Sequence, residues 1–269
     1  MTEPSDDPLA QHLAEIVQTR QAAMDAHAAL RQSQPFLNAC RRTETLVGDY
    51  GLALNAISLM STRSPTFEAA RLSIRIADLL IESAVATMAH IREGLLNPAH
   101  REMRFLLEAS IKAWWCDSVE PEGEVERKLD FLDDLGAARF RDIVDGLRPR
   151  LIAAEEAAGL VHKVTNLYKK LSTRVHASTG GVGVDLRRFE RGQYVGFEGV
   201  GDLNKANAQF AEVLDISLAC AFEAFDGGLL GDIFVQVLDD HPKWAFHKTP
   251  LVRSISSHFD YKAERQPPR

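Results

Sequence analysis

Cysteine is scarce in this chain of 269 residues, and the three that occur are widely separated at positions 40, 116 and 220. An odd number of isolated cysteines excludes a disulfide framework, and the absence of a Cys-x-x-Cys pair argues against a structural zinc site. The first residues also lack the basic and apolar regions of a signal peptide. We therefore expect reduced thiols and a cytoplasmic location.

Motifs that hold nucleotides or catalytic metals are lacking as well. Neither a glycine-rich phosphate loop nor a nucleophile elbow occurs. None of the nine histidines follows a glutamate by three residues, the spacing that a di-iron helical bundle requires. The most apolar stretch, residues 76–91, contains Asp78, Glu82 and His90, so it is too polar to cross a bilayer. We expect no cofactor, no metal and no membrane contact.

Apolar residues make up 45% of the chain, and they recur mostly at helical spacing. This pattern predicts an all-α fold, a single bundle of six to eight helices over residues 1–242, followed by an irregular tail over 243–269. We expect Leu79, Leu107 and Phe222 to be buried. The helices are expected at residues 8–31, 35–60, 66–96, 98–119, 124–147, 150–171, 202–225 and 229–239.

Helical periodicity is interrupted after residue 172. Seven glycines fall within residues 180–201, and residues 189–197 alternate around an Arg-Gly pair. We expect a short β-hairpin or an ordered loop insertion near 180–200.

The net charge of −7 excludes a polycation, but the charge is unevenly distributed. Between residues 163 and 191, seven basic side chains face two acidic ones. We expect a positive surface that contacts RNA or an acidic protein partner, or that is simply solvated. Its residues would be Lys169, Lys170, Arg187, Arg188 and Arg191, with Arg174 beside them.

Polar side chains gather where this basic region begins. Tyr168 and Ser172 lie one helical turn apart, and His176 follows four residues later, with Arg174 between. An imidazole beside cations suits general acid–base chemistry or phosphate binding. The alternative is that His176 caps the helix or bonds the backbone of the loop.

A second polar set lies on apolar helices. Arg104 and Glu108 are four residues apart, and they would form an inward ion pair against the stripe that contains Arg75 and Asp78. This set predicts a structural polar core, although buried carboxylates also serve catalysis.

The segments Arg104-Phe-Leu-Leu-Glu108 and Leu171-Ser-Thr-Arg-Val-His176-Ala-Ser together resemble poorly characterised bacterial helical proteins of the HEPN-like, abortive-infection group over about residues 66–180. The resemblance implies an all-helical, dimeric protein and, in many members, a ribonuclease with a histidine five to seven residues after an arginine. Here the arginine nearest before His176 is Arg174, two residues away. We therefore expect a non-catalytic or weakly catalytic protein of a defence or stress system, acting by oligomerisation and by partner or RNA contact. The alternative is a metal-independent ribonuclease centred on His176.

Overall fold

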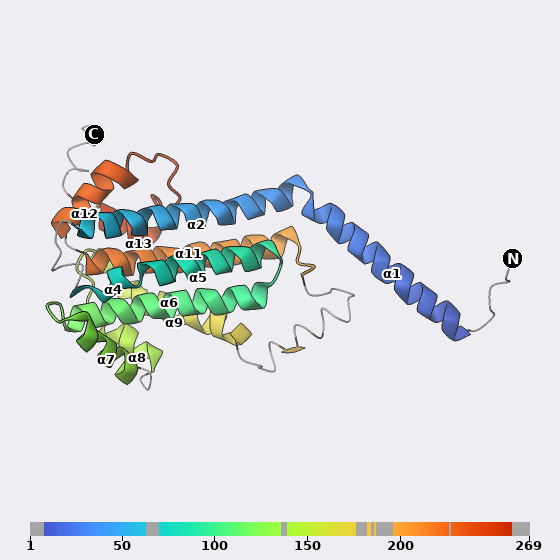
Figure 1. The fold of residues 1–269 in the computed structure, drawn as a ribbon, viewed down its shortest axis with the longest axis horizontal. Helices are drawn as coiled ribbons and strands as arrows, with labels where there is room; N and C mark the ends of the chain where they lie inside the picture. Colours follow the sequence, from blue (N-terminus) through green and yellow to red (C-terminus); the bar gives the residue numbers. More distant parts are fainter. Residues whose placement is uncertain are drawn as a thin grey trace.

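The computed structural model describes residues 8–62, 70–135, 139–175, 182–183, 186, 196–225 and 227–259. For residues 174 and 175 it describes the backbone only. These residues form eleven α-helices and one π-helix, and no strand occurs among them (Figure 1). The all-α expectation is confirmed, whereas the helices outnumber the six to eight expected because several predicted ones are divided. The helices are α1 (Pro8–Arg31), α2 (Gln34–Ser61), α4 (Leu72–Arg75), α5 (Ala77–Arg92), α6 (Leu96–Val119), α7 (Val125–Leu135), α8 (Phe140–Gly146), α9 (Ala154–Val175), α11 (Val200–Ala224), α12 (Gly227–Ile233), the π-helix η1 (Phe234–Leu238) and α13 (Pro250–Ser256).

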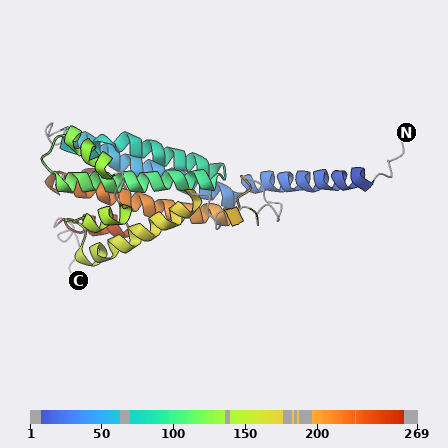
Figure 2. The same cartoon turned by 90° about the horizontal axis from the view of Figure 1, so that it is seen from below.

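Long helices that run side by side form the body of the molecule. Helix α11 packs against α2 and α6, α5 packs against both α2 and α6, and α9 packs against the outer side of α6 (Figures 1 and 2). Leu107 of α6 and Phe222 of α11 are fully buried, as their periodicity predicts. The hydrophobic core therefore lies between these helices.

Hydroxyl groups connect the three central helices inside this core. The Tyr50 hydroxyl lies 2.7 Å from that of Ser217, and Ser217 lies 2.7 Å from the hydroxyl of Ser110. Seven residues earlier in α2, Thr43 donates to the side-chain oxygen of Asn207 over 2.6 Å. Because each buried hydroxyl has a partner, these contacts fix the register of α2, α6 and α11 without leaving polar atoms unsatisfied.

One expected helix is divided near Ile76. Helix α4 ends at Arg75 and α5 begins at Ala77, where residues 66–96 were predicted to be continuous. The break changes which face of α5 meets the core, so the prediction for Leu79 is wrong: its side chain is 44% exposed. The predicted helix 124–147 is likewise divided into α7 and α8.

The C-terminal region is more ordered than the expected irregular tail. Trp244 and Phe246 are buried in the core, and α13 follows with Leu251, Val252 and Ile255 buried. Helix α13 packs against α11 and α9. Buried residues therefore continue past the boundary predicted at residue 242. The division of the chain at this residue stays a prediction.

The insertion expected near 180–200 is described only in part. Residues 182–183 and 186 are helical, residues 197–199 have no regular structure, and no strand occurs among them. The predicted β-hairpin is not seen, and most of its residues, 187–195, lie outside the described residues.

Helix α1 leaves the bundle at Ser33. The hydroxyl of Ser33 accepts a hydrogen bond from the backbone N–H of Phe36, and Pro35 occupies the first turn of α2, so the chain starts a new helix there in a new direction. In both views α1 projects past the end of the bundle (Figures 1 and 2). In the described ranges, no helix is long and apolar enough to cross a membrane.

Candidate functional site

Tyr168 joins the two polar sets that the sequence predicts separately. Its hydroxyl accepts a hydrogen bond from Nη2 of Arg104 over 2.6 Å and lies 3.5 Å from Oε2 of Glu108. The guanidinium of Arg104 also sits over the Tyr168 ring, 4.7 Å from its centre. Helices α6 and α9 are thus joined by a cation–π contact and hydrogen bonds at one point.

Further groups surround this contact on both sides. Lys112 pairs with Glu108 over 2.7 Å, one turn along α6, and Phe140 of α8 stacks on Tyr168 with ring centres 4.1 Å apart. Glu108 and Lys112 are half-buried. We name Arg104, Glu108, Lys112, Phe140 and Tyr168 the Tyr168 cluster. It holds a carboxylate between two cations, an arrangement that can orient a polar ligand or can simply fix α9 on α6.

Other members predicted for the catalytic set lie beside this cluster or outside the described residues. The hydroxyl of Ser172 donates to the backbone carbonyl of Tyr168 over 2.6 Å, so it is engaged within its own helix. Arg174 belongs to the last turn of α9, and its side chain lies outside the described part. His176, the proposed centre, also lies outside it.

The predicted positive surface is described for two of its residues. Lys169 and Lys170 are both exposed on α9. Arg187, Arg188 and Arg191 lie outside the described residues. The shared surface therefore stays a prediction.

Half of the predicted polar core is wrong. Arg104 and Glu108 are half-buried, but Arg75 and Asp78 are exposed. The physical reason is the break at Ile76, which ends the stripe on which Arg75 and Asp78 were placed. Arg104 and Glu108 instead meet Tyr168 of α9.

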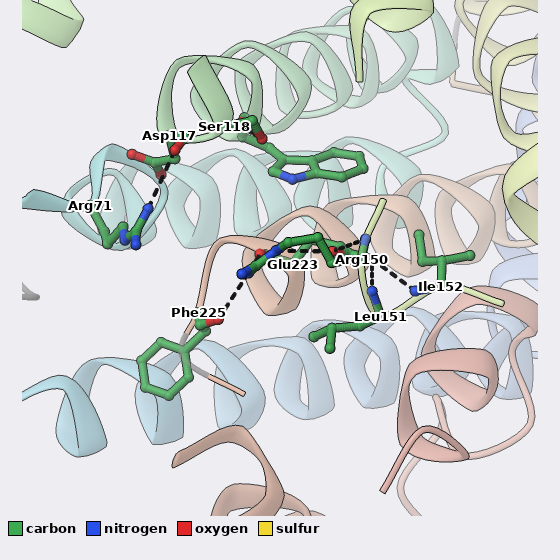
Figure 3. Close-up of polar contacts among 9 residues, drawn as sticks. Arg71, Asp117, Ser118, Arg150, Leu151, Ile152, Glu223 and Phe225 are labelled. Carbon is green, nitrogen blue, oxygen red and sulfur yellow. Dashed lines mark hydrogen bonds and ion pairs between the residues drawn. The ribbon is translucent and has the colours of Figure 1, made fainter. Parts of the chain in front are cut away.

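A solvent-excluded ion pair lies at the far end of α6, and the sequence did not reveal it. Lys128 of α7 donates to Oδ1 of Asp117 over 2.9 Å, and both side chains are buried. The carboxylate also accepts the backbone N–H groups of Leu72 and Ser73, each over 2.9 Å. Arg71 reaches the Asp117 carbonyl over 3.3 Å (Figure 3). Asp117 thus caps α4 and holds α7 at the same time.

Glu223 of α11 plays the same part for the segment before α9. Its buried carboxylate accepts three backbone N–H groups, from Arg150, Leu151 and Ile152, each over 2.8 Å (Figure 3). The Arg150 side chain additionally donates to the Glu223 and Phe225 carbonyl oxygens. Three N–H donors satisfy a carboxylate that would otherwise be costly to bury.

Two more buried aspartates bind the C-terminal region. Asp215 of α11 accepts the backbone N–H groups of Leu251 and Val252 over 3.3 and 3.1 Å, and it pairs with Lys163 over 3.3 Å. Asp49 of α2 accepts the backbone N–H of Ala245 over 2.7 Å. We name Asp49, Asp117, Asp215 and Glu223 the anchor carboxylates, since each fixes a segment distant in sequence.

A signal for these residues exists in the sequence. Asp215 and Glu223 each stand inside an otherwise apolar run of α11, where helical spacing places them among core positions. Asp117 and Lys128 were obscured because they belong to a stretch, 117–134, in which acidic residues outnumber basic ones. An acidic residue within an apolar helix indicates that its carboxylate is buried. The sequence does not indicate which backbone N–H groups that carboxylate binds.

The thiols offer no exposed nucleophile. Cys40, Cys116 and Cys220 are buried and unpaired with one another. Burial raises the pKa of the Cys116 thiol to about 11 and raises that of Cys220 well above its ordinary value. A thiol held in its neutral form is a poor nucleophile.

The described residues include no group of three or more histidine, cysteine, aspartate or glutamate side chains that could hold a metal ion. Comparison with known proteins finds no matching family, no matching curated protein and no matching solved structure.

Proposed function

We propose that this chain is a non-catalytic or weakly catalytic helical protein of a bacterial defence or stress system, which acts in the cytoplasm by oligomerisation and by contact with a partner or with RNA. The defence context and the dimeric state rest on the HEPN-like resemblance. Features of the structure support an association surface and a structural use of the buried carboxylates.

The observation that carries the proposal is α1. This helix has 24 residues, and none of them is buried. Five of its large apolar side chains are exposed, and a contiguous exposed apolar face is typical of an interaction site. A protein that works by association is expected to present such a surface.

The buried polar groups support a structural role. Each anchor carboxylate binds backbone N–H of a distant segment, and in the described contacts none forms a hydrogen bond with a histidine or a thiol. Their hydrogen bonds stabilise the fold, and a carboxylate committed in this way is not available to take a proton from a substrate.

One observation favours the alternative of a ribonuclease centred on His176 with Arg174, Tyr168 and Ser172. Helix α9 continues to Val175, and Tyr168 near its end contacts the Arg104 guanidinium. A cation beside a phenol could bind a phosphate. His176 itself lies outside the described residues.

Incubation of the purified chain with single-stranded RNA decides between the two. We expect no cleavage by the wild type. Cleavage that disappears in the His176→Ala variant, at an equal folded fraction, would establish the ribonuclease instead.

RNA contact without cleavage has its own test. Binding through Lys169 and Lys170 should weaken steeply as salt rises, because phosphate contacts release counterions. Replacing both with glutamine should reduce the salt dependence, whereas Lys243→Gln, at an exposed lysine elsewhere, should leave it unchanged. Salt-independent binding, or no difference between these variants, would remove RNA from the proposal.

A further inference from the structure

Helix α6 carries an exposed aromatic ring on its solvent face. Phe105 is 44% exposed, and the same face continues with Arg101 one turn before it and with Lys112 further along. The residues three and four positions from Phe105, which are its neighbours on the helix surface, are Arg101, Glu102, Glu108 and Ala109. The ring therefore stands among mostly charged side chains and not within an apolar patch.

Helix α9 brings an exposed cation to the same place. Helices α6 and α9 pack against each other and run in opposite directions (Figures 1 and 2). Tyr168 contacts both Arg104 and Glu108, so it is level with the middle of that turn of α6. The next residue along α9, Lys169, is therefore level with Phe105, and its side chain is exposed.

A further cation stands at the beginning of α8. Phe140, the first residue of α8, stacks on Tyr168, and the exposed Arg139 immediately precedes it. In the part of the chain that the structure describes, the side chains of Arg101, Arg139 and Lys169 make no hydrogen bond and no ion pair. Three such positive charges thus lie around the Tyr168 cluster, on a chain whose net charge is −7. We name the α6–α9 surface by its four residues, Arg101, Phe105, Arg139 and Lys169.

The α6–α9 surface combines the two contacts that an unpaired nucleic-acid strand requires. Cations bind the phosphates, and an exposed aromatic ring stacks on the face of a base, whichever base it is. A protein partner is less suited to this surface, because the centre of a protein interface is depleted in charged residues. A duplex is also less suited, since its base faces are already stacked on one another.

We propose that the α6–α9 surface binds an unpaired nucleic-acid strand, with one base stacked on Phe105 and phosphates on the three cations. The inference rests on the RNA contact in the proposed function, because it names the surface and the form of the strand through which that contact would operate. The Tyr168 cluster lies beside this surface. It joins α6 to α8 and α9, and it thereby fixes the spacing between the stacking ring and the cations.

The test measures the binding of a fluorescent single-stranded RNA of about a dozen nucleotides by anisotropy at low salt. We expect the wild type to bind and Phe105→Ala to raise the dissociation constant by at least about fivefold, because the stacked base loses its platform. Phe105→Trp keeps an aromatic ring and should bind at least as tightly as the wild type. The matched control is Val119→Ala, at a residue of the same helix that is 47% exposed, and it should leave the dissociation constant unchanged.

The cations have a test of their own. Arg101→Gln should lower the slope of log affinity against log salt concentration by about 0.7, the value for one phosphate of a single strand. Arg253→Gln, at an exposed arginine of α13, should leave the slope unchanged. Because both side chains are exposed, neither variant should shift the midpoint of unfolding, and measuring that midpoint excludes loss of the fold as the cause.

The form of the nucleic acid provides a second comparison. A duplex of the same RNA sequence should bind more weakly than the single strand and should not respond to Phe105→Ala. Equal binding of single-stranded DNA would identify bases and phosphates as the groups that are recognised. Binding of RNA alone would add the ribose hydroxyl to them.

The inference can fail in two ways. If single-stranded RNA binds equally to the wild type and to Phe105→Ala, or if the duplex binds as tightly, RNA contact stands and its surface lies elsewhere. If no RNA binds at low salt, the RNA contact in the proposed function fails as well, while association with a protein partner is unaffected. Failure of the inference is therefore distinguishable from failure of the proposed function.

Discussion

Lys128 of α7 and Asp117 of α6 form an ion pair at 2.9 Å, and both side chains are excluded from solvent. In the sequence these two residues belong to a highly charged stretch, and nothing there marks them as a pair. The exposed side chain beside Lys128, Arg127, pairs with Glu120 over 2.9 Å. Adjacent residues of one helix thus make similar contacts in opposite environments, and they provide a matched comparison.

Lys128→Met should lower the free energy of unfolding by about 3–5 kcal/mol, because removal of one partner leaves the Asp117 carboxylate buried without its counter-charge. Arg127→Met should cost less than about 1 kcal/mol, since its side chain is solvated. Urea denaturation of the two variants measures the difference. Equal costs would show that the Lys128 pair is solvated.

Glu223→Gln should destabilise the protein by about 1–3 kcal/mol, because a neutral amide accepts the N–H groups of Arg150, Leu151 and Ile152 more weakly than a carboxylate does. Its own N–H₂ group would also face these donors. Glu82→Gln, at an exposed site on α5, is the control and should have little effect. Thermal unfolding of both variants checks this, and a stable Glu223→Gln would contradict the anchoring role.

Leu107→Ala should cost about 2–5 kcal/mol, since it opens a cavity in a fully buried position. Leu79→Ala removes the same atoms from a side chain that is 44% exposed, and its cost should be clearly smaller. Denaturant midpoints of the two variants rank them. A larger loss at Leu79 would mean that α5 presents its other face to the core.

Tyr168→Phe should cost about 0.5–1.5 kcal/mol, because the hydroxyl that accepts from Arg104 is lost while the stacking on Phe140 remains. Tyr168→Leu should cost more, because it removes the ring on which both Phe140 and the Arg104 guanidinium lie. Chemical denaturation separates these contributions. Equal costs would assign the effect to the hydroxyl alone.

The contact of α1 with the bundle, in which His27 stacks on Phe197 with ring centres 4.3 Å apart, should weaken in acid. Desolvation first, and then the nearby Arg31, lower the pKa of His27 below 6.5, while Glu198 acts in the opposite direction. The imidazole of His27 has the higher pKa in the unfolded chain, so as the pH falls it takes up a proton there first. The contribution of His27 to the free energy of unfolding is therefore complete above pH 6.5 and falls as the pH drops below it.

The measurement compares the wild type with His27→Gln, which cannot titrate. Between about pH 7.5 and about pH 5.5 the wild type should lose more unfolding free energy than the variant does. Parallel pH profiles would show that His27 has the same pKa in both states.

The long helices were predictable because periodicity reports burial directly, as at Leu107 and Phe222. The break at Ile76 was not, since Ile76 continues the apolar pattern. Nor was the start of α4, where Asp117, a residue of another helix, accepts the N–H groups of Leu72 and Ser73. The Tyr168 cluster brings Arg104 and Glu108 into contact with Tyr168, and the sequence placed these residues in two separate sets. Their contact depends on how α9 packs on α6. A sequence shows which residues face inward, but tertiary packing decides which of them meet.

The anchor carboxylates join segments that lie far apart in the sequence. Asp49 and Ala245 are 196 residues apart, and Glu223 and Leu151 are 72 apart, so the connecting segments cannot be fixed until α2 and α11 have been formed and brought near. Conversely, the amide hydrogens of Leu151 and Ile152 are released when their segment leaves α11, and that of Ala245 is released when its segment leaves α2. In hydrogen exchange these three amides, although outside any helix, should exchange as slowly as the interior of α11.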